Sequence, residues 1–552
     1  MLKFVLFAFV GAFAFVLGYP CAAAVAHGLN PAAWPPAVMS PDQWLRGLLL
    51  FYALPNAGAL LEMATGHSPA FAGGGLLQIF FISAVPIAFM LVLPSAKRGP
   101  RRDPDALQGD ARWASKSERS AMKRGLEFGR DCETNRPIRV AVEGNILSIA
   151  PPRRGKTSGL IIPNLLAADN AAWNGPAIVL DPKGQAYLAV VERRRALGKS
   201  VRCLDPMAIC GGADRWNPLA TMNPSDTAYL QRVARTLLPS AVSEENAYFQ
   251  NKAVDVIVAA FQAAQHMRNA TPLAVSEFLA SPDQLADALK GVAGTTANRV
   301  RHFLTMDAKT RDPVLSTAQQ AFQWCDDERM QVLTSESTFS LVDLCAGDTD
   351  LFISLPTENL EALAPFLRWL LADLFATIRR NRVAERLIIF VDETRTLQNC
   401  RELITAAGEL PGAGASLWTF WQDRSQIFSV YGDHDAATLL RSSEFVTVSD
   451  PAMVDPDERE FWSRALSDFT VLEETKVSDK SAQGGRTSSS HAPRGVRLMT
   501  GEELGRLPSR DLILFPNSDR YAKRAVRLRK TRHDDTRFVG LTTPVAPVGA
   551  TP

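Results

Sequence analysis

The feature that most restricts the fold of this chain is a strand, loop and helix signature between residues 145 and 167. The apolar run from Ile146 to Ile149 enters a loop rich in proline, arginine and glycine, and Gly155-Lys156-Thr157 then opens a segment of small and apolar residues. In such a signature, loop N–H groups surround a β-phosphate, the lysine reaches the β- and γ-phosphates, and the threonine hydroxyl ligates Mg²⁺. The signature therefore predicts a P-loop with ATP and Mg²⁺ as ligands. Its expected binding residues are Ala150, Pro151, Pro152, Arg153, Arg154, Gly155, Lys156, Thr157 and Ser158.

One position departs from the G-x-x-x-x-G-K-[ST] spacing, because Ala150 stands at the first glycine, and this leaves open an accidental G-K-T at a helix start. A second motif argues against an accident. The apolar run Leu387 to Val391 ends in Asp392 and Glu393, and a P-loop ATPase needs a buried parallel strand that delivers an acid opposite the Lys-Thr pair. We expect Asp392 to hold the Mg²⁺ hydration shell and Glu393 to orient and polarise the attacking water.

Two further apolar runs end in polar residues. One leads to Asp181 and Lys183, and the other, SLWTFWQ, ends at Gln422. In a doubly wound sheet the carboxyl ends of the strands line the ligand crevice. Gln422 is therefore a candidate γ-phosphate sensor, and Asp181 and Lys183 are candidate supporting groups, although a structural turn explains each of them equally well.

Composition limits the remaining possibilities. With 60 basic and 58 acidic residues the chain is nearly neutral, so any surface for nucleic acid must be local. At 552 residues, a prior of about 150 residues per domain suggests three or four folding units. The cysteines lack C-x-x-C spacing and indicate neither a zinc site nor a disulfide framework, as expected of a cytoplasmic protein. They are Cys21, Cys132, Cys203, Cys210, Cys325, Cys345 and Cys400.

The N-terminal region has two apolar segments. Residues 4–18 form either a first transmembrane helix or a signal peptide, since the run is short and small residues follow it. Residues 71–94 carry no charge and are long enough to cross a bilayer. Lys97, Arg98, Arg101 and Arg102 follow immediately, so the positive-inside tendency places the rest of the chain in the cytoplasm under either interpretation.

The rest of the chain divides by pattern. Between residues 223 and 330 apolar residues recur at helical spacing, which indicates an inserted all-α domain of mixed charge. This domain could capture substrate or could be only a solvated structural bundle. A basic segment, 521–533, could contact DNA phosphates or acidic lipid, or form a charged edge strand. The expected divisions are 1–97, a membrane region of two transmembrane helices with a periplasmic loop; 98–222 and 331–535, two parts of a nucleotide-binding domain; 223–330, the all-α domain; 476–495, a disordered loop; and 536–552, a flexible tail.

The order of these motifs resembles the coupling proteins of type IV secretion systems, the TraG/TraD-like family of conjugation ATPases. The resemblance extends from residue 1 to about 530. The matching pieces are GDARWAS (109–115), APPRRGKTSGLIIPNLL (150–166), DPKGQAY (181–187), LDP (204–206), RWNPL (215–219), DLFISLPTENLEALAPFLRWLLADLF (350–375), FVDETRTL (390–397) and GAGASLWTFWQDRSQIFSVYG (412–432).

The resemblance implies a homo-hexameric ring of RecA-like cytoplasmic domains on a stem in the bacterial inner membrane. The all-α domain would capture secreted effector proteins or a relaxase-DNA complex at the base of the channel formed by the other secretion components. It also implies that Lys156 and Thr157 bind nucleotide and metal, that Asp392 and Glu393 form the acidic pair, and that Gln422 is the sensor.

The sequence departs from the family at one mechanistic position. Several relatives have a trans-acting arginine just before the A-G step of GELPGAGAS, where this chain has Pro411 and Gly412. Arg395, Arg401 or Arg441 could substitute, which matters because such an arginine contributes on the order of 10³-fold or more to hydrolysis. Two alternatives to a coupling ATPase remain: an FtsK-like DNA translocase, whose relatives usually carry more membrane helices and a winged-helix reader, and a membrane scaffold that binds nucleotide without hydrolysing it.

Overall fold

The computed structural model describes residues 101–102, 105, 107–238, 244–268, 270–356, 358–397, 400–451, 455–479 and 486–543. Contacts divide the chain into two units, Met1–Arg101 and Arg102–Pro552. The two expected membrane segments and the loop between them lie outside the described residues. Within the described ranges, no helix combines the length and the apolar character needed to cross a bilayer.

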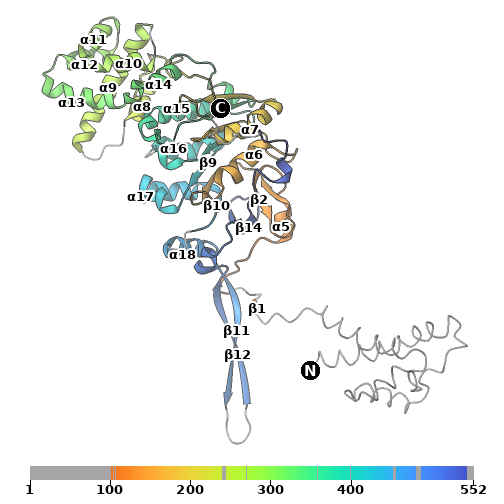
Figure 1. Ribbon diagram of the computed structural model, residues 1–552. Helices are drawn as coiled ribbons and strands as arrows, with labels where there is room; N and C mark the ends of the chain where they lie inside the picture. The colour runs from red at the N-terminus through yellow and green to blue at the C-terminus, as the bar shows by residue number, and fades with distance from the viewer. Residues whose placement is uncertain are drawn as a thin grey trace, which may run out of the picture. The chain divides into compact units, whose positions relative to one another are not determined.

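An eleven-stranded sheet forms the centre of the second unit (Figure 1). Its strand order is β3-β2-β14-β13-β10-β4-β9-β8-β5-β7-β6, in which the strands from β10 to β6 are parallel and the others antiparallel. The parallel strands are β4 (Asn145–Ile149), β5 (Ala177–Leu180), β6 (Ser200–Leu204), β7 (Thr349–Ile353), β8 (Leu387–Val391), β9 (Ala415–Trp421) and β10 (Ser443–Val448). The antiparallel strands are β2 (Leu126–Asp131), β3 (Pro137–Val140), β13 (Asp511–Pro516) and β14 (Val526–Arg529). The predicted α/β class is confirmed.

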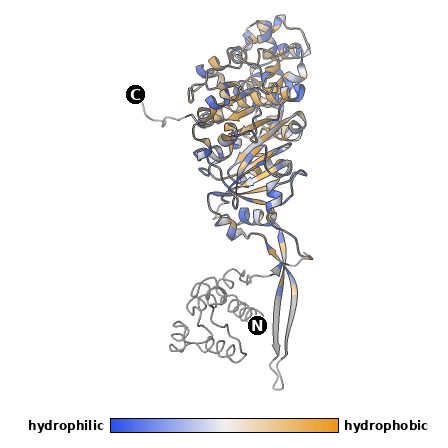
Figure 2. Cartoon of the chain, turned by 90° about the vertical axis from the view of Figure 1, so that its right-hand side faces the viewer, coloured by the Kyte–Doolittle hydropathy of each residue, from blue (hydrophilic) through white to orange (hydrophobic). Residues whose placement is uncertain are grey.

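Two layers of apolar side chains cover the two faces of this sheet. On β5, Ile178 and Leu180 belong to one core cluster, and Ala177 and Val179 belong to the other, because successive strand side chains point to opposite faces. Every residue of β4, β5, β7, β8 and β9 is buried, as expected of parallel strands covered on both sides. Figure 2 shows the hydrophobic residues concentrated in the strands of the sheet.

Helices pack on both faces of the sheet. The α-helices of this layer are α5 (Lys116–Ser120), α6 (Ile162–Leu166), α7 (Gln185–Ala196), α15 (Leu360–Asn381), α16 (Arg401–Glu409), α17 (Arg424–Arg441), α18 (Pro456–Ala465) and α19 (Gly501–Gly505). The short helical turns are η2 (Thr157–Ile161), η6 (Thr394–Leu397), η7 (Leu410–Ala413) and η8 (Thr536–Phe538). The apolar residues of α6 and α7 join one core cluster, and those of α15, α16 and α17 join the other.

In its described part, the segment between β6 and β7 contains helices and loops and no strand. Its helices are α8 (Thr227–Leu237), α9 (Glu244–His266), α10 (Pro272–Ala280), α11 (Pro282–Ala288), η3 (Leu289–Gly291), α12 (Thr295–Leu304), α13 (Ala308–Gln320), η4 (Gln323–Asp326), α14 (Glu328–Leu333) and η5 (Asp343–Cys345). Helix α9 packs against α8, α10, α12 and α13, and the helices gather to one side of the sheet (Figure 1).

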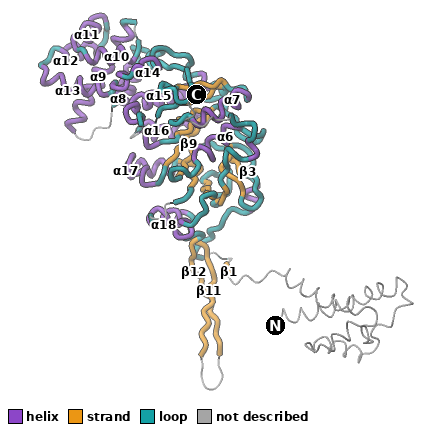
Figure 3. The backbone as a smooth tube through the Cα atoms, viewed as in Figure 1, coloured by secondary structure: helices purple, strands orange, loops and turns teal. Residues whose placement is uncertain are grey.

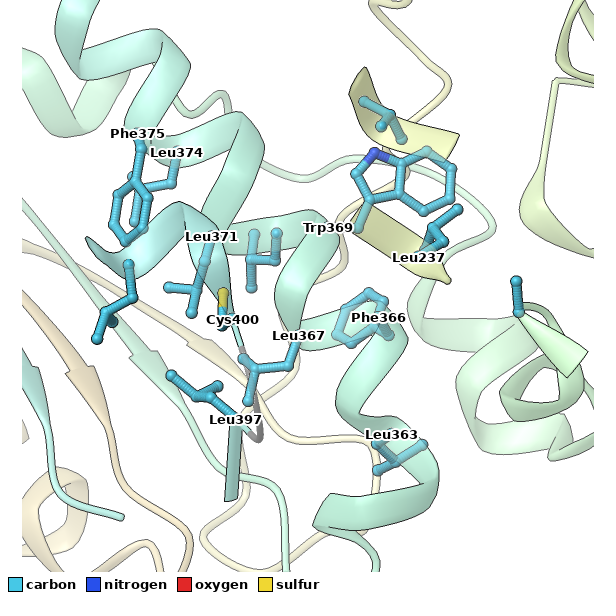
Figure 4. Packing of buried hydrophobic residues seen from close by; sticks show 14 of the residues in the cluster. Leu237, Leu363, Phe366, Leu367, Trp369, Leu371, Leu374, Phe375, Leu397 and Cys400 are labelled. Atoms are coloured by element: carbon cyan, nitrogen blue, oxygen red, sulfur yellow. The ribbon is translucent and has the colours of Figure 1, made fainter. Parts of the chain in front are cut away.

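Helix α15 joins the helical segment to the sheet layer. Trp369 packs near Leu237 of α8, whereas Leu371 points toward Cys400 and Leu397, which lie beneath α15 (Figure 4). All five side chains are almost completely buried. Burial of a large apolar side chain contributes roughly 1.5–3 kcal/mol to the stability of the fold. Helix α15 therefore holds the helical segment and the sheet layer together, because it buries apolar side chains against both.

The prediction of a disordered loop over residues 476–495 is wrong where the structure describes that segment. Strands β11 (Asp468–Asp479) and β12 (Arg486–Arg497) pair antiparallel along their whole length, from Asp468 with Arg497 to Asp479 with Arg486. They extend away from the sheet as a ribbon (Figure 3). The pairing uses backbone hydrogen bonds, which require no apolar periodicity in the sequence, and threonine, serine and valine tolerate extended backbone. Residues 480–485 lie outside the described part, and a two-residue strand, β1 (Arg101–Arg102), precedes the main sheet.

The C-terminal expectations are also corrected. Strand β14 lies between β13 and β2, so the basic segment contributes an internal strand of the sheet and not an edge. Its valine and leucine are buried while Arg527 and Arg529 are exposed, which explains its charged composition. The predicted flexible tail is ordered from 536 to 543, because Phe538 is 1% exposed and the Thr543 N–H donates to the Ala189 carbonyl at 3.1 Å. Residues 544–552 are outside the described part.

Candidate functional site

The parallel register brings four strand ends to one level. Ile149 of β4 pairs with Trp421 of β9. Val391 of β8 pairs with Thr419 of β9 on one side and with Leu180 of β5 on the other. The residues that follow these strands therefore emerge together at the carboxyl edge of the sheet, where ligands bind in open α/β folds. Because β9 lies between β4 and β8, Gln422 follows the strand that separates the loop from the acidic pair.

The loop after β4 turns sharply before its helix begins. Arg153 and Gly155 have φ values of 60° and 81°, and glycine adopts the second without steric cost. The Gly159 N–H donates to the Gly155 carbonyl at 2.8 Å, which closes the first turn. A π-helix, Thr157–Ile161, begins within this turn and continues into α6. Such a loop directs successive N–H groups toward an anion.

The two motifs predicted to share a ligand meet directly. The Thr157 hydroxyl Oγ1 donates to Asp392 Oδ2 at 2.6 Å, although the two residues are 235 positions apart. Glu393 follows Asp392 and lines the same cavity as Lys156. The expected convergence of the lysine-threonine pair and the acidic pair is therefore present.

A cavity of about 400 Å³ collects most of the predicted residues. It is lined by Pro152, Arg153, Gly155, Lys156, Thr157, Ser158, Asp181, Pro182, Lys183, Gln185, Asp392, Glu393 and Gln422. Three predicted residues do not line it. Ala150 and Arg154 line a separate small pocket together with Lys530, Gly155 and Lys156 line both pockets, and Pro151 lines neither. Pro182 and Gln185 also line the cavity but were not predicted as site residues; the matched DPKGQAY segment after a strand end was the signal that could have found them.

Burial sets the electrostatics of the acidic groups. It raises the pKa of Asp392 above its ordinary value, while the Thr157 hydrogen bond and the Lys156 and Lys183 ammonium groups oppose that shift. Burial also raises the pKa of Glu393, again opposed chiefly by Lys156. Carboxylates enclosed in this way gain from a nearby cation, so the cavity favours a positively charged ligand beside them.

Asp181, directly after β5, holds the start of α7 next to the cavity. Its Oδ2 accepts from the N–H groups of Ala186 at 2.7 Å and Tyr187 at 3.0 Å, so it caps the helix that borders the cavity. Burial raises the pKa of Asp181 to about 6, and the charge of Asp392 adds to the shift. Lys183, two residues later, is exposed at the cavity.

The donor set suits a magnesium-bound triphosphate. The Thr157 hydroxyl and the Asp392 carboxylate are hard oxygen ligands at hydrogen-bond distance from each other, and Mg²⁺ is usually held by one or two such groups together with phosphate oxygens. Lys156 brings a positive charge to the same cavity, as a phosphate group requires, and Glu393 adds a second carboxylate next to Asp392. Arg395, Arg401 and Arg441 are exposed, and none of the three lines this cavity.

Comparison with known proteins gives a consistent result. Residues 107–533 match the family model described as type IV secretory system conjugative DNA transfer. A conjugal transfer protein TraG of Agrobacterium fabrum is 26% identical over 382 residues, covering 66% of this chain and 57% of the relative. The chain spans less than three fifths of the length of the curated TraG relatives that it matches.

Solved structures share the fold. The bacterial conjugative coupling protein TrwBdeltaN70 superposes with a TM-score of 0.59 at 18% identity, covering 80% of this chain and 97% of that structure. The plasmid coupling protein TrwB in complex with ADP and Mg²⁺ gives a TM-score of 0.58 at 17% identity, covering 80% and 98%. At these identities the likeness establishes the α/β fold of the described unit.

Proposed function

The chain belongs to the type IV secretory system conjugative DNA transfer family, and from this premise we propose that it is a coupling ATPase, which recruits substrates to a secretion or conjugation channel and drives their transfer by ATP hydrolysis. The observation that carries the proposal is the 2.6 Å hydrogen bond between Thr157 and Asp392. It joins the phosphate loop to the acidic strand end, the arrangement on which P-loop hydrolysis depends.

We assign the residues as follows. Lys156 and the loop N–H groups bind the β- and γ-phosphates, and Thr157 and Asp392 hold the metal. A bound Mg²⁺ would supply charge neutralisation at the phosphates. Glu393 orients the attacking water and accepts its proton, and Gln422, at the end of the intervening strand, contacts the γ-phosphate. The TrwB structure with ADP and Mg²⁺ supports the choice of ligands.

The remaining assignments concern the assembly. We propose a homo-hexamer anchored in the bacterial inner membrane by the two N-terminal apolar segments, with its catalytic bulk in the cytoplasm. The helical segment from α8 to α14 would receive secreted effector proteins or a relaxase-DNA complex and present them to the channel components. The family match and the TraG relative support this proposal.

The decisive test is ATP hydrolysis by the full chain in detergent or nanodiscs, with and without DNA. Lys156→Ala should reduce phosphate release on the order of 10²-fold or more, because the lysine contacts the charge that develops in the transition state. It should also abolish export while leaving membrane insertion intact. Lys116→Ala, an exposed lysine on α5 that is outside both the cavity and the helical segment, is the matched control. Nucleotide binding by the wild type without any turnover would support a non-hydrolysing scaffold, and full export by Lys156→Ala would refute the proposal.

A further inference from the structure

The carbonyl group of Ser158 lacks a partner inside its own helix. In the π-helical turn the Ile162 N–H donates to the Thr157 carbonyl, so it does not serve Ser158. The next N–H in the π pattern would come from residue 163, which is proline and has none. The His533 N–H, from a distant part of the chain, supplies the missing hydrogen bond at 3.0 Å. A backbone group beside the phosphate loop is thus satisfied by the C-terminal segment.

The same segment touches the loop helix so closely that one position requires glycine. A Cβ atom on Gly159 would lie 2.8 Å from the Thr531 carbonyl oxygen, a distance that side chains do not tolerate without movement. Thr531 is itself fixed, because its hydroxyl donates to Glu127 Oε1 at 2.7 Å and its side chain is buried. The contact therefore joins two backbones and leaves little freedom between them.

Lys530 holds the other end of the phosphate loop. Its Nζ donates to the Arg154 carbonyl at 3.3 Å and lies 3.7 Å from Asp450 Oδ2. Arg154 Nε lies 3.3 Å from the same carboxylate oxygen. The side chain of Lys530 is only 12% exposed, so this ion pair is less screened by solvent than a surface pair.

The C-terminal segment is anchored independently of the loop. Arg537 binds both oxygens of the buried Glu127, at 2.6 Å and 3.1 Å. Arg130 pairs with Asp535 at 2.5 Å. The buried Phe538 and the bond from Thr543 to Ala189 of α7 fix its end. The segment is therefore a fixed support for the loop, not a tail that rests on it.

We propose that residues 530–543, the C-terminal strap, position the phosphate loop for nucleotide binding, with Lys530 and the His533 N–H as the positioning groups. Lys530 lines the small pocket beside the loop, and no residue of the strap lines the cavity where the phosphates are expected. It acts by keeping the loop N–H groups preorganised, and loosening it adds an ordering cost to binding. The inference rests on the proposed nucleotide-binding function.

Two variants separate the strap from the loop by different means. Lys530→Met removes the contacts with Arg154 and Asp450 but keeps most of the side-chain volume, and Lys530→Arg is the conservative rescue. Gly159→Ala pushes against the Thr531 backbone. Gly408→Ala on α16, where a Cβ meets nothing within 4 Å, and Lys523→Met, an exposed lysine paired with Asp519, are the matched controls.

The full chain would be assayed for ADP binding with a fluorescent analogue, for KM and kcat with ATP, and for hydrogen exchange of the loop and strap. We expect Lys530→Met and Gly159→Ala to raise the Kd for ADP and the KM for ATP roughly 3- to 10-fold, as for the loss of one hydrogen bond, with kcat changed less than about 2-fold. Lys530→Arg should recover most of the affinity. By thermodynamic reciprocity, ADP should slow exchange in the strap of the wild type.

The possible failures are distinct. If the wild type does not bind ADP, the proposed function fails and the strap inference falls with it. If the wild type binds ADP but both variants bind as tightly, or if kcat falls while KM is unchanged, only the strap inference is overturned. If one variant fails to fold, the other variant and the wild-type exchange measurement still decide, and absence of ADP protection in the strap counts against it.

Discussion

A buried ion pair between Arg194 of α7 and Asp350 of β7 gives the sharpest stability prediction. The guanidinium group of Arg194 is fully buried, as is the carboxylate of Asp350 on β7. Arg194 donates to both Asp350 oxygens, at 2.7 Å and 2.9 Å, and also to Asn174 Oδ1 at 3.0 Å and the Gly175 carbonyl at 2.7 Å. Replacing it with methionine leaves the carboxylate with one remaining donor, the Ala177 N–H at 2.8 Å.

Arg194→Met should therefore lower the free energy of unfolding by about 3–5 kcal/mol, since it leaves a buried charge without its partner. The assay is urea unfolding followed by tryptophan fluorescence. The double variant Arg194→Met/Asp350→Asn should recover at least about 1 kcal/mol, because the amide still accepts from Ala177 and no charge remains. Arg195→Met breaks an exposed pair with Glu192 and should change stability by less than about 0.5 kcal/mol. A loss below about 1 kcal/mol for Arg194→Met, or no recovery in the double variant, would refute this account.

Three further predictions use other groups. Glu393→Gln should keep ADP binding but reduce phosphate release on the order of 10²-fold, because the amide cannot accept a proton; turnover within about 3-fold of wild type would contradict its role. Burial raises the pKa of Asp373 to about 7 from 3.8, against the hydrogen bond from the Tyr229 hydroxyl. The folded protein then binds the extra proton, so stability should fall as the pH rises from about 4 to about 7. Asp181 contributes in part of the same range, so Asp373→Asn should make the slope shallower in urea titrations, and an unchanged slope would refute the assignment. Asn164→Leu removes three hydrogen bonds to the backbone of Glu127 and Leu160 and should cost about 3 kcal/mol in the same assay; a loss under about 1 kcal/mol would count against it.

The meeting of the two motifs at the candidate site could be predicted from the sequence. Gly155, Lys156 and Thr157 are adjacent in the chain, and Asp392 follows an apolar run, so local order alone indicates their place at strand ends. The parallel register then brings the two motifs together. The same reasoning assigned Ala150 and Arg154 to the ligand, whereas they line a separate small pocket, because a spacing pattern does not specify which way each loop residue points.

Sequence patterns were a weaker guide where structure depends on distant partners. The β11 and β12 ribbon is held by backbone bonds, which leave no apolar pattern to read. The charged residues of β14 suggested an edge strand, yet β14 pairs on both sides.

Local sequence thus determined that this chain has an α/β fold with a phosphate loop and an acidic strand end, since those features are encoded by neighbouring residues. Tertiary structure alone decided what supports the loop. The Ser158 carbonyl could be seen to lack a helical partner only once the π-turn was known, and its partner, His533, lies near the other end of the chain. Such a contact depends on the folded path of the whole chain, because a hydrogen bond between main-chain groups of distant segments does not depend on which side chains those residues carry.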